Sequence, residues 1–413
     1  MKSKITVLLV FAFVLTINAA VSAAQPEKRA FINGLRPMSM GGAFIAVADD
    51  ENAFFYNPAA ITGRNGYSIQ VLSIDAVLLT DTLDLYKFYK DNRKDITKWS
   101  RLTQQQQTEL MNRVLNNALD KPAGVLISAP SVTFINKPIA IKENYLNFGG
   151  GLFSWIETVA KFKRGALFPC LYYNAQITGI GIIPLAYKIT SLDAVKLHGT
   201  LSLGVNFKYM YRGKNCQVRV SLDEIQNYDF LNAFLEGTAF GMDFGAIYHL
   251  NTCWNFGLNV ADIFTTCVKY KNVYKDSRDY GQRLNESIKL NLGVGLAYFP
   301  GKFYYWTDKY LNTNNNLMLV FDITDLTGTE ERFIESPFKK IHFGAECKLS
   351  PFVIRMGFNS GYPTVGLGVV TKIVNLEYAF YGEEQGNYAG QKPSWIHRMQ
   401  LSVKFGNNDK SKK

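Results

Sequence analysis

The chain has 413 residues, of which 19% are charged, 14% are aromatic and 33 are glycine. This aromatic and apolar content excludes disorder. A helical membrane protein is also excluded, because no apolar run beyond residue 24 approaches the roughly 20 residues that a spanning helix needs. The net charge of +11 is dispersed, which disfavours nucleic-acid binding and suits a surface near anionic lipid or anionic small molecules.

Residues 1–24 have the layout of a secretory signal peptide. Lys2 and Lys4 precede a stretch of 13 mostly apolar residues, and small residues follow up to Ala24. The sequence therefore predicts cleavage after Ala23 or Ala24 and a location outside the cytoplasm. A membrane anchor is the alternative, but the apolar stretch is too short to span a bilayer.

Residues 25–65 are rich in small residues and do not alternate. Gly41, Gly42 and Ala43 permit close backbone approach, Asp49 or Asp50 can cap a short helix, and Asn57-Pro58 is a turn signal. A segment that is this small and kinked fits inside a barrel.

The long link 77–122 predicts a helical insert at residues 81–121. Thr103 and Gln106 form a capping-box pattern. Leu110, Val114, Leu115 and Ala118 then follow at helical spacing. We expect an extracellular helical cap with this apolar stripe packed on the barrel rim. Either the helix merely shields a loop, or its surface captures lipid.

From residue 66 onward apolar residues recur with period two, which predicts strands with one apolar face. In 199–211, Leu203, Val205 and their apolar neighbours alternate with Asn206, Lys208 and glycine. In 287–299, Ile288 is expected on the apolar face that carries Leu292. A soluble sandwich also alternates, but glycines and charges on the polar face and aromatics at the strand ends are typical of a transmembrane barrel.

Fourteen strands are predicted, an even number typical of an outer-membrane barrel. They lie near 66–76, 123–135, 144–154, 176–189, 199–211, 238–250, 254–263, 287–299, 316–325, 340–349, 351–359, 363–370, 372–381 and 395–405. Short and long connections alternate between them. Two connections fit this alternation poorly: 300–315 is long where a short turn is expected, and 359–362 is short where a long loop is expected.

The turn around Ser350-Pro351 predicts the register of one strand pair. A two- or four-residue turn places Glu346 opposite Arg355, on the inward face. There the charges can be hydrated or paired, whereas on the lipid face an arginine near the midplane costs about 2–4 kcal/mol. The pair is either a plain cross-strand salt bridge or a ligand contact.

No catalytic, metal or cofactor motif is found. The five cysteines lack CxxC spacing, although a Cys253–Cys267 bridge is conceivable across one strand and its loop. The four histidines are too scattered for a metal site, and no GxSxG or Walker motif is present. We therefore expect a protein that is not an enzyme and that uses no metal and no cofactor.

The N-terminal motif resembles a known family. The segment Gly41-Gly42-Ala43 through Asp49-Asp50 to Asn57-Pro58-Ala59 is similar to the N-terminal hatch of FadL-type outer-membrane channels. The C-terminal run from His342 to Gly386 is similar to the PorV/TraF-like branch of that superfamily. The resemblance implies a fourteen-stranded transmembrane barrel (residues 66–405) around a lumenal hatch (residues 25–65), in the bacterial outer membrane.

The same resemblance implies site residues. Those that match the hatch motif are Gly42, Ala46, Asp49, Asp50, Asn57 and Pro58. In the fatty-acid channels the third strand opens a lateral exit, so Gly149, Gly150 and Gly151 are either a lateral gate or a plain bulge that makes room for the hatch. Candidates for the ligand path are Phe54, Phe55, Tyr56, Lys208 and Arg355, with hatch packing as the alternative use of the three aromatics.

Two functions remain open. One is a channel for passive uptake of hydrophobic or amphipathic small molecules such as long-chain fatty acids, and the other is a PorV-like adaptor for secreted proteins without a conducting path. The expected partners are outer-membrane lipid, a hydrophobic ligand and, for the adaptor, secreted proteins, but no nucleic acid. Residues 406–413 form a basic tail that we expect to be disordered in the periplasm.

Overall fold

The structure is a computed structural model. It describes residues 34–96, 98–117, 119, 121, 123–128, 131–163, 170–192, 197–215, 218–221, 234–272, 286–300, 316–328, 336–384 and 388–406. The predicted signal peptide, Ala118, most of the 300–315 link and the tail beyond Gly406 lie outside these residues.

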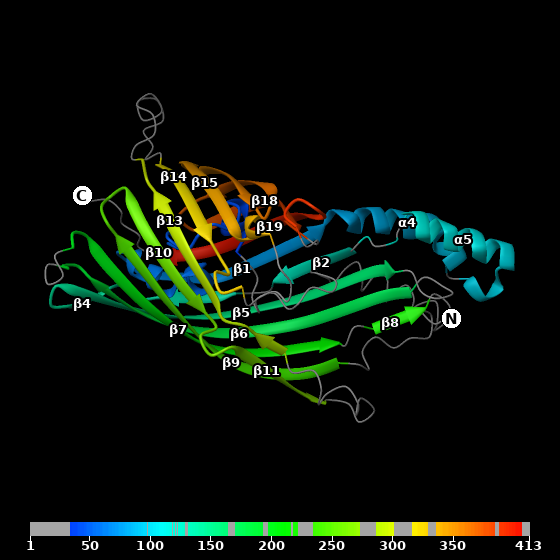
Figure 1. Ribbon diagram of the computed structural model, residues 1–413, viewed down its shortest axis with the longest axis horizontal. Helices are drawn as coiled ribbons and strands as arrows, with labels where there is room; N and C mark the ends of the chain where they lie inside the picture. Colours follow the sequence, from blue (N-terminus) through cyan, green and yellow to red (C-terminus); the bar gives the residue numbers. More distant parts are fainter. Residues whose placement is uncertain are drawn as a thin grey trace.

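The described strands form one closed antiparallel barrel (Figure 1). They are β1 (Ser68–Leu79), β2 (Ala123–Ser128), β3 (Val132–Ile135), β4 (Ile139–Ile141), β5 (Asn144–Lys163), β6 (Cys170–Ile189), β7 (Thr200–Asn215), β8 (Val218–Ser221), β9 (Phe234–His249), β10 (Trp254–Ala261), β11 (Thr266–Asn272), β12 (Glu286–Ile288), β13 (Asn291–Tyr298), β14 (Asn316–Ile323), β15 (Ile341–Leu349), β16 (Phe352–Asn359), β17 (Tyr362–Val370), β18 (Val374–Glu384) and β19 (Pro393–Gly406).

Several neighbouring segments belong to one barrel strand. β2, β3 and β4 continue one another, and so do β7 with β8, β10 with β11, and β12 with β13. The described part of the chain therefore makes a barrel of 14 strands. β1 closes it by pairing with β19, from Ser68 opposite Gly406 to Leu79 opposite Ile396. The predicted fold class is confirmed.

The apolar face of the strands points outward. On β7, Phe207 and Tyr209 are 42% and 59% exposed, whereas Asn206 and Lys208 on the opposite face are buried. Leu401 on β19 is also exposed. A soluble sandwich would bury these apolar side chains against a second sheet. The reversed burial is that of a barrel whose outer face contacts lipid and whose lumen is polar.

The two ends of the barrel differ in their connections. At one end lie short turns, such as those between β15 and β16 and between β17 and β18. The predicted register of the first of these pairs is confirmed, with Glu346 opposite Arg355. The opposite end carries the longer links and the helices α4 (Thr80–Ile96), η2 (Trp99–Arg101) and α5 (Gln104–Asn117).

The helical loop forms as predicted, but it packs differently. Gln106 N donates to Thr103 Oγ1 at 3.3 Å, and Thr103 N donates to Gln106 Oε1 at 3.0 Å, which completes the capping box. The buried Leu110 packs with Tyr89 and Trp99 in a cluster made of the helices themselves. The expected packing on the barrel rim is therefore wrong. Figure 1 shows α4 and α5 extending away from the barrel. The apolar side chains of α5 therefore pack against α4 and not against the barrel rim.

None of the helices among the described residues has the length and apolarity that crossing a membrane requires.

Three further expectations are corrected. Ile288 is 2% exposed and points inward, because the two residues between β12 and β13 shift the alternation. The predicted loop 155–175 is largely strand, since β5 and β6 pair from Lys163 and Cys170 onward. Cys253 and Cys267 are both free.

The described part of the hatch, residues 34–65, lies inside the barrel (Figure 1). It contains α2 (Leu35–Ser39), α3 (Ala53–Tyr56) and η1 (Pro58–Gly63). Its apolar side chains, such as Leu35, Phe44 and Phe54, are fully buried and form one cluster with inward-facing wall residues. The core of the protein is thus the hatch itself, enclosed by the wall.

Candidate functional site

The small residues of the hatch motif let its backbone turn and approach the wall. Gly41 and Gly42 have φ of 69° and 85°, a left-handed conformation that side chains with a Cβ adopt rarely. Gly41 N donates to Thr364 Oγ1 at 3.0 Å, and Gly41 O contacts His342 Nδ1 at 2.8 Å. The glycines therefore place the hatch backbone directly against β15 and β17.

Glycines in the strands face the hatch and make room for it. A Cβ on Gly357 would lie 2.4 Å from Gly41 N, and one on Gly245 would lie 2.0 Å from Asn57 Oδ1. Such contacts are too short for any side chain. The wall glycines whose Cβ would lie closer than 3.0 Å to a hatch atom are Gly204, Gly245, Gly257, Gly293, Gly344, Gly357 and Gly366. The many glycines on the inward face of the wall thus leave the space that the hatch backbone occupies.

Arg36 joins the hatch to the wall through buried ion pairs. Its Nε and Nη2 donate to the two carboxylate oxygens of Glu346, at 2.7 and 2.8 Å. Its Nη1 donates to Asp49 and to Asp50, the paired acids of the hatch motif. Burial alone would lower the pKa of Arg36, but the carboxylates of Asp49, Glu346 and Asp50 raise it well above its usual value. Arg36 is therefore bidentate to Glu346 on the wall, and the two acids of the hatch motif hold its remaining nitrogen.

The network continues into the wall at Arg355. Arg355 is 2% exposed, and its Nε donates to Glu346 at 2.7 Å while its Nη1 donates to Glu377. Lys348 lies 3.2 Å from the same glutamate. Arg355, a candidate for the ligand path, is thus held between two carboxylates.

Asn57 and Asp322 anchor the hatch backbone. The Asn57 amide donates to the carbonyls of Ile45, Ala246 and Leu258, and its Oδ1 accepts from Ala59 N. The carboxylate of Asp322 on β14 accepts from the backbone N–H groups of Phe44 and Ile45. Polar groups in the lumen therefore satisfy hatch backbone groups that have no strand or helix partner.

The other motif positions are buried. Ala46 is 1% exposed, and its carbonyl accepts from Asn255 Nδ2 at 3.4 Å. Pro58 begins η1 after the Asn57 cap. All six motif residues of the hatch thus lie at the hatch, among wall contacts or turns.

Glu51 ties the hatch to β19 and β1. Its carboxylate accepts from Lys404 on β19, from Arg64 at 3.2 Å and from Ser68 at 3.1 Å. Burial would raise the pKa of Glu51, but the neighbouring Lys404 and Arg64 hold it well below its usual value.

The strand ladder is interrupted at Ser131, where β1, β2, β3 and β5 meet. β1 pairs with β2 at Asp75 to Leu78 and with β3 at Ser68 to Gln70 in the same register. Between these segments Ser131 N still donates to Ser73 O at 3.2 Å, and residues 129 and 130 lie outside the described residues. The pairing with β5 shifts by one residue between the two segments, from Ser128 opposite Trp155 to Val132 opposite Leu152. The expected continuous strand 123–135 is therefore broken.

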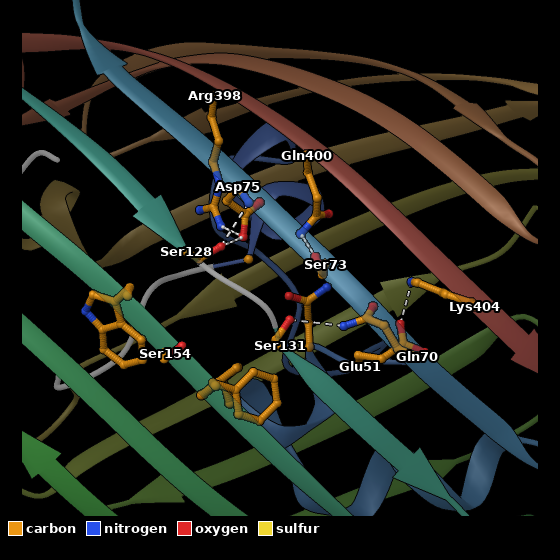
Figure 2. Close-up of a pocket in the computed structure, with 15 residues that line it drawn as sticks. Glu51, Gln70, Ser73, Asp75, Ser128, Ser131, Ser154, Arg398, Gln400 and Lys404 are labelled. Carbon is orange, nitrogen blue, oxygen red and sulfur yellow. Dashed lines mark hydrogen bonds and ion pairs between the residues drawn. The ribbon is translucent and has the colours of Figure 1, made fainter. Parts of the chain in front are cut away.

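A cavity of about 60 Å³ lies between this interruption and the hatch (Figure 2). Its lining includes Ser73, Ser128, Ser131 and Ser154 from the interrupted strands. The remaining residues that line it come from the hatch, β1, β5 and β19: Gly34, Glu51, Asn52, Phe55, Gln70, Asp75, Phe153, Trp155, Arg398, Gln400 and Lys404. Figure 2 shows these polar side chains converging from the wall and the hatch.

The candidates for the ligand path lie in different places. Phe55 lines the cavity, and its ring lies 4.6 Å from that of Phe153. Phe54 and Tyr56 are buried in the hatch, where the Tyr56 ring packs edge-on against Phe44. Lys208 lies 2.7 Å from both Asp243 and Asp262. Only Phe55 among these five contacts the cavity.

Gly149, Gly150 and Gly151 lie within β5 and pair in register with β3. On the other side of β5, Gly149 and Gly150 have no ladder partner on β6, and the register is the same before and after them. Pro184 of β6 lies at this gap and has no N–H to donate. A Cβ on Gly151 would lie 3.2 Å from the Phe54 ring. Of the three glycines, Gly151 faces this hatch side chain, whereas a Cβ on Gly149 would lie 2.5 Å from Phe134 O and one on Gly150 would meet no atom within 4 Å.

Sequence reasoning missed Arg36 and the cavity. Arg36 stands among small residues, 13 positions before the Asp49-Asp50 pair, and this pattern could have indicated a buried ion pair. Pro130, inside the predicted strand 123–135, was a signal for an interruption, since proline cannot donate to a strand ladder.

Known proteins share this architecture. The family model of the F plasmid transfer operon protein TraF matches residues 174–308. The crystal structure of the P. putida toluene transporter TodX superposes with a TM-score of 0.50 at 11% identity, over 90% of this chain and 97% of that one. No curated protein sequence matches the chain.

Two further hydrocarbon channels are less similar. The Ralstonia pickettii toluene transporter TbuX has a TM-score of 0.43 at 11% identity, over 91% of this chain and 98% of that one. The monoaromatic hydrocarbon channel CymD has a TM-score of 0.45 at 12% identity, over 91% and 97%. The TodX superposition confirms the resemblance predicted from the hatch motif at the level of the fold: the chain has the fold of the FadL-type outer-membrane channels, and residues 174–308 match the TraF family model.

Proposed function

We propose that this protein is an outer-membrane channel for the passive uptake of hydrophobic or amphipathic small molecules, a class that includes long-chain fatty acids. The observation that carries the proposal is the cavity that lies between the hatch and the part of the wall formed by β1, β5, β19 and Ser131. The fold shared with the toluene transporter TodX supports it. Passive transport needs no chemistry on the solute, which agrees with the expectation that the protein is not an enzyme.

The path begins at the end of the barrel with the long links and ends at the hatch. The residues 34–65 act as the plug, held by Asn57, Asp49 and Asp50. A small displacement of Phe55 would connect the lumen to the wall beside Ser131 and β5, through which an apolar solute enters the membrane sideways. In this proposal the lateral gate lies at this part of the wall, next to the Gly149–Gly151 run of β5.

Uptake of a labelled solute tests the proposal. The full chain is produced in a bacterial host that lacks channels of this fold, and uptake of radiolabelled toluene and decanoate is compared with that of cells carrying the empty vector. We expect uptake above the vector for at least one of the two solutes. Ser131→Leu, which fills the cavity, is expected to reduce that uptake at least about fivefold.

Ser287→Leu is the matched control, because Ser287 is exposed on β12 and lies outside the cavity. Folding of each variant is checked by the heat-dependent mobility of the barrel in gel electrophoresis. Wild-type uptake equal to that of the empty vector for both solutes would overturn the proposal and leave the adaptor for secreted proteins as the function to test. Full uptake by a folded Ser131→Leu variant would place the path elsewhere.

A further inference from the structure

The cavity beside the hatch has a polar part and an aromatic part. Gln70, Ser73, Ser131 and Gln400 line it with neutral hydrogen-bonding groups. The rings of Phe55, Phe153 and Trp155 line it as well. A pocket that combines a few polar groups with aromatic side chains is the usual form of a small-molecule site.

The charged groups in the lining neutralise one another. Arg398 lies 3.3 Å from Asp75, and the Lys404 ammonium lies 2.5 Å from the carboxylate of Glu51. The four formal charges in the lining therefore sum to zero. An ionised head group would enter a site whose charges are already matched, and it would lose its hydration without gaining an opposite charge.

The neutral groups retain capacity to accept hydrogen bonds. Gln70 Nε2 donates to Ser131 Oγ at 3.2 Å, and Gln400 Nε2 donates to Ser73 Oγ at 3.1 Å (Figure 2). Within the part of the chain that the structure describes, the amide oxygens of both glutamines accept no hydrogen bond. They are fixed acceptors at the edge of a cavity, which suits a ligand that donates.

The size of the cavity limits what enters it. Its volume of about 60 Å³ is well below the roughly 150 Å³ of a cavity that holds a benzene ring. A head group of a few atoms fits, and the apolar body of the ligand must remain against Phe55 and Phe153.

We infer that this cavity binds the uncharged, hydrogen-donating head group of an amphipathic solute, a hydroxyl or a primary amide, while the apolar body lies on the aromatic side chains. The inference rests on the proposed function and narrows its substrate class: neutral amphipaths are preferred over carboxylates and over bare hydrocarbons. Gln70 and Gln400 are the residues that determine this preference.

Binding of three probes with the same ring tests the inference. Toluene, benzyl alcohol and benzoate are each equilibrated by dialysis against the full-length protein in detergent, with empty micelles as the blank. We expect benzyl alcohol to bind on the order of fivefold more tightly than the other two, which is the contribution of one neutral hydrogen bond. Equal binding of all three, tighter binding of benzoate, or no binding of benzyl alcohol would overturn the inference.

Two variants locate the preference. Gln70→Leu is expected to remove the advantage of benzyl alcohol and to leave toluene binding unchanged, and Gln176→Leu, outside the cavity, serves as its control. Asp75→Asn leaves the Arg398 cation unmatched and is expected to increase benzoate binding, whereas Asp84→Asn, on the exposed helix α4, is not. An unchanged preference in a folded Gln70→Leu variant would overturn the assignment to this cavity.

The outcomes separate the inference from the proposed function. Cells that take up toluene while the purified protein shows no preference for benzyl alcohol would keep the channel and remove the head-group site. Cells that take up neither toluene nor decanoate would remove the channel itself. If Asp75→Asn fails to fold, the Gln70→Leu comparison alone decides the inference.

Discussion

The hatch contacts several parts of the barrel wall, including β7, β9 and β10, and two other parts hold it in different ways. The continuous wall, β14 to β18, has uninterrupted ladders, glycines that admit the hatch backbone, and the buried Arg36–Glu346 pair. The interrupted wall, β1, β2, β3 and β5, meets the hatch across a cavity lined by serines and glutamines. The continuous wall therefore fixes the position of the hatch, and the interrupted wall leaves room for it to adjust.

The largest effect is expected from breaking the contact with the continuous wall. Arg36→Ala leaves Asp49 and Asp50 without their shared cation, while Glu346 keeps Arg355 and Lys348. The loss is therefore expected to be at most about 3–5 kcal/mol, which is the cost of removing one partner of a fully buried pair. Hydrogen exchange of residues 34–63 in the purified protein should accelerate accordingly. Arg113→Ala, which removes an exposed ion pair with Asp95 on the helices, should change stability by less than about 1 kcal/mol. Unchanged hatch exchange in Arg36→Ala would show that the pair does not hold the hatch.

Acid should release the hatch at Glu51, which holds it to β19 and β1. Its pKa is lowered from 4.5 by Lys404 and Arg64, so the folded protein binds this proton less readily than the unfolded chain does. The resulting stability is complete above about pH 4.5 and decreases as the pH falls below it. Glu51→Gln should remove that part of the pH dependence, which hydrogen exchange between pH 3 and pH 7 measures. A variant with the wild-type pH profile would assign the effect to other carboxylates.

Adding one methyl group should distinguish the two walls directly. Gly357→Ala places a Cβ 2.4 Å from Gly41 N, so the hatch must shift, at a cost of about 1–3 kcal/mol. Gly150→Ala on β5 meets no atom within 4 Å and should leave the free energy of unfolding nearly unchanged. Thermal unfolding of the two variants in the same detergent makes the comparison. Equal destabilisation would contradict the difference between the walls.

The smallest effect is expected from the polar side of the cavity. Gln70→Leu removes one neutral hydrogen bond to Ser131, worth about 1 kcal/mol. The melting temperature should fall only slightly, and the hatch should exchange at nearly the wild-type rate. A loss as large as that of Arg36→Ala would mean that the interrupted wall also fixes the hatch.

Much of the fold could be predicted from local patterns. Period-two alternation predicts the strands because a spanning strand has one face in lipid and one in the lumen, as Phe207 and Lys208 on β7 show. The turn at Ser350-Pro351 predicts the register of Glu346 and Arg355 because a short hairpin leaves few alternatives. The capping box predicts the start of α5 for a similarly local reason.

The errors arose where distant residues decide. Leu110 packs against α4 instead of the rim because the helices extend away from the barrel. The inward direction of Ile288 is an exception with a local cause, a two-residue irregularity between β12 and β13 that alternation does not reveal. The interruption beside β2 was signalled by Pro130, but its consequence, a cavity shared with the hatch, needs the positions of four strands.

By itself, the sequence determined the barrel, the number of its strands and the presence of a small-residue hatch, because each follows from residues close together in the chain. Only the tertiary structure decided which wall holds the hatch and where the cavity lies. Arg36 and Glu346 are 310 positions apart, and Gln70 meets Gln400 and Lys404 in the cavity only because the first and last strands close the barrel. No local sequence pattern predicts a contact that exists only because the barrel closes.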